Sequence, residues 1–287
     1  MRSYQPVVII GAPRSGTNML RDILCKFDGV STWPCDEINY IWRHGNLTYP
    51  SDELPYTLAY SSVKKYIRKQ FDWVAEKYDA SIVIEKTCAN SLRIPFVDEV
   101  IPEAKYIYIV RNGIDVTGSA KLRWTAKLNI QYILQKVRFV PLLDLPYYAL
   151  RYFRSRVYRL LSRESRLEFW GPSLDGMSQL VKNYNLNEIC ALQWQTCVNN
   201  SEKAFSKNHN DRVFMLRYED LVKNPVEKIS EVLNYICVSA SYDFIVDTVG
   251  SISTKSLAKG RTTLNNIEID SLYKLIGDTL EYYGYLK

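Results

Sequence analysis

A loop whose residues could hold an anion lies near the start of the chain. Gly11 and Gly16 stand at its two ends, and Arg14, Ser15 and Thr17 offer side-chain hydrogen-bond donors between and after them. The glycines allow the backbone to approach a ligand closely. The first turn of the helix expected after the loop presents backbone N–H groups that lack partners within the helix. These residue types and their spacing predict a site for a phosphate or a similar anion.

The loop differs from the phosphate-binding loop of nucleoside triphosphatases at the decisive position. After Gly16, where such enzymes carry Lys and then Ser or Thr, this chain has Thr17 and Asn18. A later apolar strand pattern ends in Arg111, where a magnesium-binding Asp would stand in such enzymes. The two departures disfavour an ordinary ATPase or kinase. A P-loop kinase of a small hydroxyl compound is kept as an alternative.

The pattern Gly-x-Pro-Arg-Ser-Gly-Thr is instead similar to the 5′-phosphosulfate loop of sulfotransferases that use 3′-phosphoadenosine-5′-phosphosulfate (PAPS). Arg111, followed eight residues later by Ser119, resembles the motif that binds the 3′-phosphate in this family. An Arg-Tyr-Glu-Asp-Leu run at 217–221 and a Lys-Gly-Arg run at 259–261 follow in the family's order. The resemblance covers residues 7–261. It implies PAPS as the sulfate donor and 3′,5′-ADP as a product, with no metal required.

The resemblance also implies roles for individual residues. Glu37 would be the base that removes the acceptor proton, and Asp36 is the second candidate for that role. Lys86 and Arg14 would stabilise charge on the transferring sulfuryl group and the leaving phosphate, and Lys86 could also protonate the leaving oxygen. The residues expected to bind the nucleotide are Arg14, Ser15, Gly16, Thr17, Asn18, Arg111, Ser119, Tyr218, Lys259, Gly260 and Arg261.

Each of these residues also has a purely structural interpretation. Glu37 can be a helix N-cap or a solvated loop acid, and Lys86 can be a surface lysine. Tyr218 can be a core tyrosine beside a capping acid, and the run at 259–261 can be an ordinary exposed turn. The order of the motifs along the chain favours the functional interpretation.

Strands must lie before these motifs and helices after them. Runs of β-branched and aromatic residues precede the loop, Lys86, Arg111 and Tyr218, and apolar residues at helical spacing follow. The carboxyl ends of parallel strands meet at one edge of a sheet, where ligands bind. We therefore expect one domain over residues 1–287, with a three-layer, P-loop-like α/β fold around a central parallel sheet. The expected strands are 7–10, 82–84, 105–110 and 213–217, with a short one beginning at 30.

Composition limits the class of protein. The 287 residues are 47% hydrophobic and 24% charged, which is typical of a globular domain. The six cysteines have no Cys-x-x-Cys spacing and the two histidines are isolated, so we expect reduced core cysteines and no metal site. The first six residues are too short and polar for a signal peptide, and no apolar run approaches the roughly 18 residues of a membrane span. We therefore expect a cytoplasmic protein.

The positive charge is concentrated in one segment. Residues 121–168 contain eleven Lys and Arg but three Asp and Glu, although the net charge of the whole chain is only +6. This predicts a basic helical insertion at 121–170 over the substrate side. A helix over 145–168 would put arginines opposite one apolar stripe. The members of that stripe would be Leu150, Phe153, Val157, Leu160 and Leu161.

Such a helix can rest on anionic lipid, bind an acidic polymer or present a solvated face over a packed stripe. The aromatic residues of the insertion could stack on sugar rings. We therefore expect the acceptor to be a saccharide or a lipid-linked saccharide, with peripheral membrane contact through 145–168 and no nucleic-acid partner. A basic glycan- or membrane-binding protein without turnover is kept as a second alternative.

Overall fold

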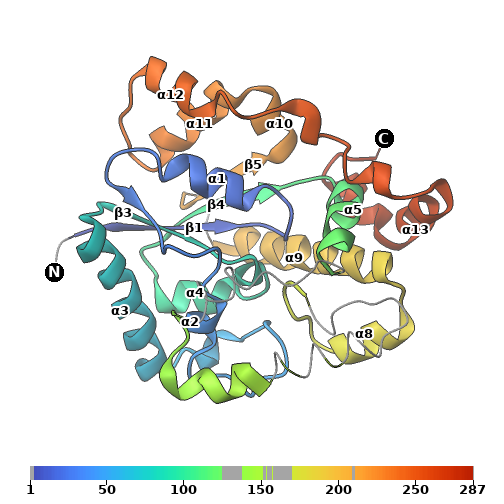
Figure 1. Ribbon diagram of the computed structural model, residues 1–287, viewed down its shortest axis with the longest axis horizontal. Coiled ribbons are helices and arrows are strands. Elements are labelled where there is room, and N and C mark those ends of the chain that lie inside the picture. Colours follow the sequence, from blue (N-terminus) through green and yellow to red (C-terminus); the bar gives the residue numbers. More distant parts are fainter. Residues whose placement is uncertain are drawn as a thin grey trace.

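Within the residues that the computed structural model describes, five parallel strands form one sheet in the order β2-β3-β1-β4-β5 (Figure 1). The strands are β1 (Gln5–Ile10), β2 (Val30–Ser31), β3 (Ile82–Lys86), β4 (Lys105–Val110) and β5 (Val213–Arg217). The described residues are 3–124, 138–150, 153, 157, 170–208 and 211–286.

Helices cover both faces of the sheet because successive strand residues point to opposite sides. On β1, Val7 and Ile9 pack into one apolar cluster, whereas Val8 and Ile10 pack into the other. The upper face in Figure 1 carries α1 (Thr17–Leu24), α10 (Tyr218–Lys223), α11 (Pro225–Tyr235) and α12 (Tyr242–Val249). The lower face carries α2 (Asn39–Arg43), α3 (Ser61–Tyr78), α4 (Ile94–Val100) and α9 (Leu186–Asn208).

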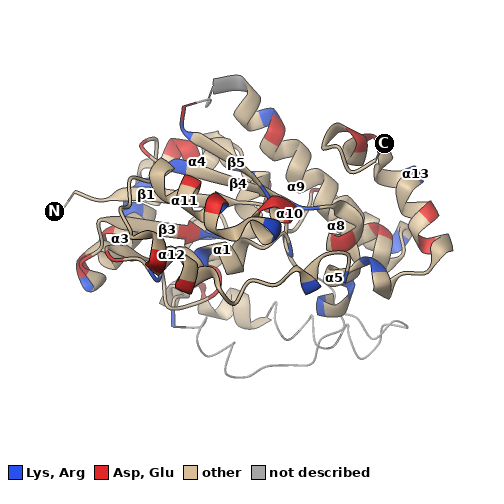
Figure 2. Ribbon diagram, turned by 90° about the horizontal axis from the view of Figure 1, so that it is seen from above, with Lys and Arg blue, Asp and Glu red and all other residues tan. Residues whose placement is uncertain are grey.

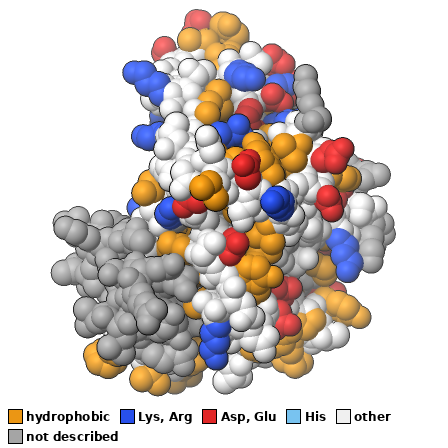
Figure 3. Space-filling view, turned by 90° about the vertical axis from the view of Figure 1, so that its right-hand side faces the viewer, with side chains coloured by type: hydrophobic (Ala, Val, Ile, Leu, Met, Phe, Trp, Pro, Cys, Tyr) orange, Lys and Arg blue, Asp and Glu red, His pale blue; other side chains and the backbone are white. Residues whose placement is uncertain are grey.

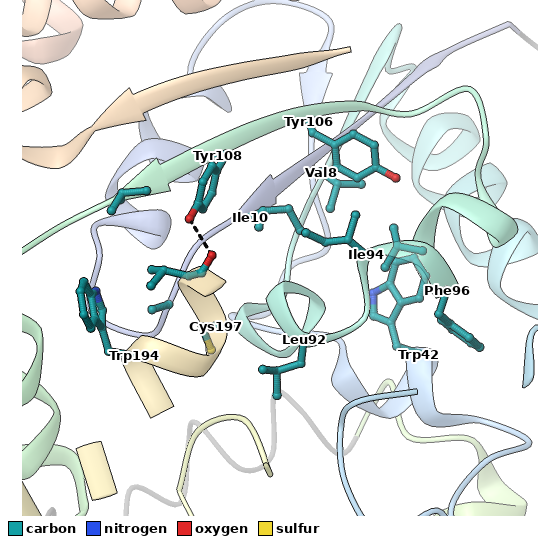
Figure 4. Close-up of a cluster of buried hydrophobic side chains, with 14 of the residues drawn as sticks. Val8, Ile10, Trp42, Leu92, Ile94, Phe96, Tyr106, Tyr108, Trp194 and Cys197 are labelled. Carbon is teal, nitrogen blue, oxygen red and sulfur yellow. Dashed lines mark hydrogen bonds between the residues drawn. The ribbon is translucent and has the colours of Figure 1, made fainter. Parts of the chain in front are cut away.

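The larger apolar cluster lies below the sheet (Figure 4). Tyr106 and Tyr108 enter it from β4, and Trp194 enters it from α9. The Tyr108 hydroxyl is 2.8 Å from that of Tyr283 near the end of the chain. The Trp194 indole N–H donates to the carbonyl oxygen of Arg111, 3.0 Å away. The core therefore holds the end of β4, where the proposed 3′-phosphate motif begins.

The remaining helices lie beyond the carboxyl ends of the strands or close one side of the molecule. The last long helix begins with a capping box, in which Asn265 and Glu268 satisfy each other's backbone N–H groups. The remaining helices are α5 (Gly113–Trp124), α8 (Met177–Asn183) and α13 (Asn266–Tyr282), the last of which carries the capping box. The short 3₁₀ turns are η1 (Tyr56–Leu58), η2 (Cys88–Leu92), η3 (Leu142–Asp144), η4 (Thr254–Ser256) and η5 (Arg261–Thr263).

The α/β fold and the parallel sheet confirm the sequence prediction, but the expected insertion is corrected in part. Residues 145–150 are helical, and the described members of the apolar stripe, Leu150, Phe153 and Val157, are exposed. A packed stripe is therefore the wrong interpretation for these three residues. Leu160, Leu161 and the arginines between 151 and 166 lie outside the described residues. No helix in the described ranges has the length and apolar content that crossing a bilayer requires.

The cysteine prediction also needs one correction. All six cysteines lie in the described residues and carry free thiols. Cys237, however, is exposed rather than in the core. It follows α11 with φ +62°, a left-handed conformation at the helix end, and its sulfur lies 3.6 Å from the Lys105 Nζ.

Candidate functional site

The loop between β1 and α1 requires both of its glycines. Gly16 has φ +91°, and a Cβ there would lie 2.4 Å from the ring of Tyr218. A Cβ at Gly11 would lie 2.7 Å from the carbonyl oxygen of Ile109. Arg14 has φ +72°, which is uncommon for a residue other than glycine. The loop is therefore a closely packed turn at the carboxyl end of β1.

This turn contains a buried hydroxyl without a partner. The Ser15 side chain is fully buried, and its Oγ has no hydrogen-bond partner among the described residues. Gly16 caps α1 without a side-chain hydrogen bond. Buried polar groups are normally hydrogen-bonded, and helix N-termini favour anions. A phosphate bound here would satisfy both the hydroxyl and the helix end, so the residues present fit such a group.

Arg111 joins the loop to the segment that precedes the Lys-Gly-Arg run. One of its terminal nitrogens donates to the carbonyl oxygen of Arg14 at 3.0 Å, and the other donates to that of Ser256 at 2.8 Å. Its guanidinium carbon lies 4.3 Å from the ring centre of Tyr218, whose hydroxyl donates to Ser256 Oγ at 2.7 Å. The loop, Arg111 and Tyr218, which the sequence predicted to bind nucleotide, therefore lie together in one cluster with Ser256.

Arg14 extends from the loop to α5. Its Nε donates to the Ser119 hydroxyl at 2.9 Å, so the loop and the proposed 3′-phosphate motif are directly bonded. Burial, together with the nearby Arg123 and Arg111 guanidinium groups, lowers the pKa of Arg14. Figure 2 shows further basic positions on α5. Several cations in one partly buried place favour an anionic ligand, because the ligand would relieve their mutual repulsion.

Lys86 ends β3 and faces two carboxylates. Its Nζ lies 3.0 Å from Glu37 Oε1 and 3.3 Å from Asp36 Oδ1. The Lys86 side chain is only 1% exposed, so the surface-lysine interpretation is wrong. Burial alone lowers the pKa of Lys86, but the Glu37 and Asp36 carboxylates outweigh it and hold that pKa above its ordinary value. Lys86 is therefore a cation at neutral pH.

The two carboxylates have different surroundings. Asp36 accepts hydrogen bonds from the Asn18 amide and, through its side chain and carbonyl oxygen, from Arg21. Asn18, predicted to bind nucleotide, is thus bonded to Asp36. Glu37 Oε1 accepts from the backbone N–H of Cys88 at 3.4 Å as well as from Lys86. The Glu37 side chain is 26% exposed, so it is open to solvent while it contacts the buried lysine.

The Lys-Gly-Arg run lies against α5. A Cβ at Gly260 would lie 1.8 Å from the carbonyl oxygen of Asp115, and one at Gly118 would lie 1.9 Å from that of Gly260. The Arg261 backbone N–H donates to Asp115 Oδ1 at 3.0 Å. Lys259 is exposed, but Gly260 is buried. The exposed-turn interpretation is therefore wrong for Gly260, which is fixed on the helix that carries Ser119.

Some residues of the site were missed because their roles depend on long-range contacts. Ser91 accepts the Gly11 backbone N–H at 3.2 Å, and Thr17 Oγ1 lies 3.7 Å from Cys88 Sγ. Ser256 binds both Arg111 and Tyr218. Its place three residues before Lys259, in a polar loop, was the only signal in the sequence.

A buried ionic network was also missed, and it supports the carboxylate side. Arg93 is fully buried and donates to Asn39 Oδ1 at 2.6 Å, two residues after Glu37. Burial lowers the pKa of Arg93 to about 10, although Asp52 opposes that change. Asp52 accepts from Arg43 at 3.0 Å and from the Asn39 amide at 3.2 Å. The network joins the turn after Lys86 to the segment that carries Glu37.

Comparisons with known proteins bear on the family and the fold of the chain. A model of the sulfotransferase family matches residues 6–168, more than half of the chain. A search of curated proteins gave no match. Within the described residues, no group of three or more His, Cys, Asp or Glu could hold a metal ion.

Several solved structures share the fold. The sulfotransferase domain from the curacin biosynthetic pathway aligns with a TM-score of 0.55 at 15% identity, over 96% of this chain and 99% of that chain. Sulfotransferase STF9 from Mycobacterium avium aligns with a TM-score of 0.56 at 11% identity, over 99% and 78%. The sulfotransferase domain of the Synechococcus PCC 7002 olefin synthase aligns with a TM-score of 0.54 at 13% identity, over 96% of both. At these identities the likeness to the solved structures concerns the fold alone. The family model spans most of the strands and motifs described above. It shows that the chain belongs to the sulfotransferase family, whose members are transferases of class EC 2.8.2.

Proposed function

We propose that this sulfotransferase, as one domain over residues 1–287, moves the sulfuryl group of PAPS to an acceptor hydroxyl by in-line displacement and releases 3′,5′-ADP. The observation that carries the proposal is the junction at Arg111. This side chain is bonded to the anion-binding loop and to Ser256, and it lies against the Tyr218 ring. One nucleotide with phosphates at both its 5′ and 3′ positions would use the loop and the α5 region together. Tyr218 would lie near its adenine.

In this proposal, Ser15, Gly16, Thr17 and Asn18 surround the 5′-phosphosulfate, and Arg111 and Ser119 bind the 3′-phosphate. Lys259, Gly260 and Arg261 close the 3′ side from the edge of α5. The Arg261 Nε is buried without a partner among the described residues, and a phosphate bound there would satisfy it. Arg14, bonded to Ser119, lies between the two phosphate sites and serves both.

Lys86 would neutralise negative charge on the oxygen that bridges sulfur and the 5′-phosphate. That S–O bond breaks as a new bond forms between sulfur and the acceptor oxygen, and the electron pair stays on the leaving phosphate. The raised pKa of Lys86 favours this electrostatic role over proton donation, because a firmly protonated ammonium is a poor acid at neutral pH. We therefore choose charge neutralisation between the two roles open to Lys86.

Glu37 would take the acceptor proton. Its carboxylate is partly exposed and contacts Lys86, whereas Asp36 also binds Asn18 and Arg21 from α1. Asp36 is therefore the positioning residue and Glu37 the base. When the donor attracts the Lys86 ammonium, Glu37 loses that cationic partner and becomes the better proton acceptor.

A saccharide or lipid-linked saccharide is the proposed acceptor class. Tyr40, three residues after Glu37, contacts Tyr148 of the insertion edge to face, with ring centres 4.8 Å apart. Tyr147 lies against Tyr148 at 5.3 Å. These half-exposed rings give an aromatic surface that begins at Tyr40, close in sequence to the proposed base, and aromatic surfaces of this kind suit sugar rings.

The direct test is transfer of labelled sulfate from PAPS to a panel of sugars, glycolipids, tyrosyl peptides and phenols. We expect a saccharide acceptor, with turnover reduced about a hundredfold or more by Glu37→Gln and much less by Asp36→Asn. Equal loss in both variants would remove the distinction between base and positioning residue. Transfer to phenols alone would contradict the acceptor class. Magnesium-dependent ATP hydrolysis would favour the kinase alternative, and nucleotide binding without transfer to any acceptor would favour the non-catalytic one.

A further inference from the structure

A group of large apolar side chains projects from the segment around η3. Leu142 is 83% exposed, Leu143 is 90% exposed and Leu150 is 70% exposed, and Phe153 nearby is 66% exposed. The segment lies along the lower margin of Figure 1, and Figure 3, turned about the vertical axis, shows hydrophobic side chains along the same margin. Single exposed leucines are normal, but four large apolar side chains within twelve residues indicate an interaction surface.

The segment is fixed in place behind these side chains. Asp144 is buried, and its Oδ2 lies 2.8 Å from His44 Nδ1 of the loop after α2. Phe139 packs edge to face on Trp73 of α3, with ring centres 6.0 Å apart. The contacts that attach this segment to the rest of the protein therefore do not involve the exposed leucines. They project from a segment that is already attached to the core by its polar and aromatic residues.

A cavity of about 390 Å³ opens between α3 and the start of this segment. Tyr66, Trp73 and Phe139 form aromatic walls, and Lys77 and Arg138 supply positive charge. The Lys77 Nζ lies 4.6 Å from the centre of the Trp73 ring. Leu142 also lines the cavity, so the cavity borders the first of the projecting leucines. The described residues that line it include no Asp or Glu.

The part of the sequence that contains these leucines also has an excess of positive charge. Residues 121–168 contain eleven Lys and Arg against three Asp and Glu. An anionic bilayer surface attracts a region that combines three features: apolar side chains that can insert, a tryptophan at their border and an excess of cations. An acidic soluble polymer would use the cations but would leave the leucines without an apolar partner. The combination therefore favours lipid.

We propose that this surface, made of Leu142, Leu143, Leu150 and Phe153 beside the Lys77 and Arg138 cavity, docks on an anionic phospholipid bilayer. The leucines enter the layer of headgroups and upper acyl chains, and a lipid phosphate occupies the cavity between the two cations. Docking does not depend on sulfate transfer. It would bring a lipid-linked acceptor to the same membrane as the enzyme.

The test is sedimentation of the full chain with vesicles of phosphatidylcholine alone or of phosphatidylcholine with phosphatidylserine. We expect binding only to the vesicles that contain phosphatidylserine, reduced about tenfold or more by the double variant Leu142→Glu/Leu143→Glu. Ile267→Glu is the matched control, because Ile267 is 82% exposed on α13, outside this surface. Lys77→Ala and Arg138→Ala should each weaken binding about fivefold, whereas the exposed Lys274→Ala should not.

Three results would overturn docking. These are equal binding to both kinds of vesicle, unchanged binding by the double leucine variant, and retention on an acidic polysaccharide without any vesicle binding. Binding of 3′,5′-ADP, measured on the same variants, verifies that they are folded. It also separates the two proposals, because failure to bind vesicles leaves the nucleotide site intact, and failure to bind nucleotide leaves the membrane surface intact.

Discussion

The donor side and the acceptor side of the candidate site are built differently. On the donor side, the buried Arg111 and Tyr218 side chains both donate hydrogen bonds to Ser256, and the Ser15 side chain is completely buried. On the acceptor side, Glu37 is partly open to solvent and Tyr40 meets the insertion through a ring contact. The residues of the proposed donor side are therefore closely packed against one another, whereas the proposed acceptor side is more open to solvent.

This difference has a physical cause. The donor side uses a tight glycine turn and the carboxyl ends of β1, β4 and β5, which the core on both faces of the sheet holds in place. The acceptor side uses residues after β2, a strand of two residues, and the segment around η3. Lys86, at the end of β3, bonds Glu37 and Asp36, and Asp36 in turn accepts a hydrogen bond from Asn18 of α1, so this group connects the two sides.

The largest effect should come from breaking that connection with Lys86→Ala. We expect turnover to fall about a thousandfold, because the charge on the leaving oxygen loses its buried counter-ion, while affinity for 3′,5′-ADP falls much less, by about tenfold. Steady-state rates and calorimetry measure the two quantities. Lys182→Ala, at an exposed position on α8, is the control. Near-normal turnover in Lys86→Ala would remove Lys86 from the mechanism.

A second variant tests how rigid the donor side is. Gly16→Ala would place a methyl group 2.4 Å from the Tyr218 ring at a residue with φ +91°, so we expect nucleotide affinity to fall about a hundredfold. Gly277→Ala is the matched control, because the nearest atom to its Cβ would be 3.8 Å away. If Gly16→Ala binds 3′,5′-ADP normally, the loop is not a preformed anion site.

A smaller effect, on the stability of the fold, should follow from changing Asp52 in the buried ionic network that supports the acceptor side. Burial raises the pKa of Asp52, but Arg93 and Arg43 outweigh it and hold the pKa below its usual value. The ionised carboxylate therefore stabilises the fold above the pKa of an unfolded aspartate, about 3.9, and this contribution is lost as the pH falls through the lower folded-state pKa. We expect Asp52→Asn to cost about 2 kcal/mol at neutral pH.

Urea unfolding at pH 7 and near pH 3 measures this prediction. The difference in the free energy of unfolding between the wild type and Asp52→Asn should shrink at the lower pH. A difference that is the same at both pH values would show that the charge of Asp52 does not stabilise the fold.

The strands, loop and helices that carry the proposed donor side were easier to predict from the sequence than the contacts between distant segments. Strand, loop and helix around Gly16, and the strand that ends at Arg111, are local patterns, so periodicity and motif spacing were sufficient to find them. Ser256, Cys88 and the Arg93 to Asp52 network act through contacts between distant segments. The exposure of Leu150 depends on what the insertion packs against, which an amphipathic pattern alone does not determine.

The most direct test of the account is calorimetry that compares 3′,5′-ADP with 5′-AMP. If one nucleotide uses both the loop and Arg111, the wild type should bind 3′,5′-ADP at least about tenfold more tightly than 5′-AMP. Arg111→Ala should remove most of that difference. No binding of 3′,5′-ADP by the folded wild type, or equal affinity for both nucleotides, would contradict the central claim.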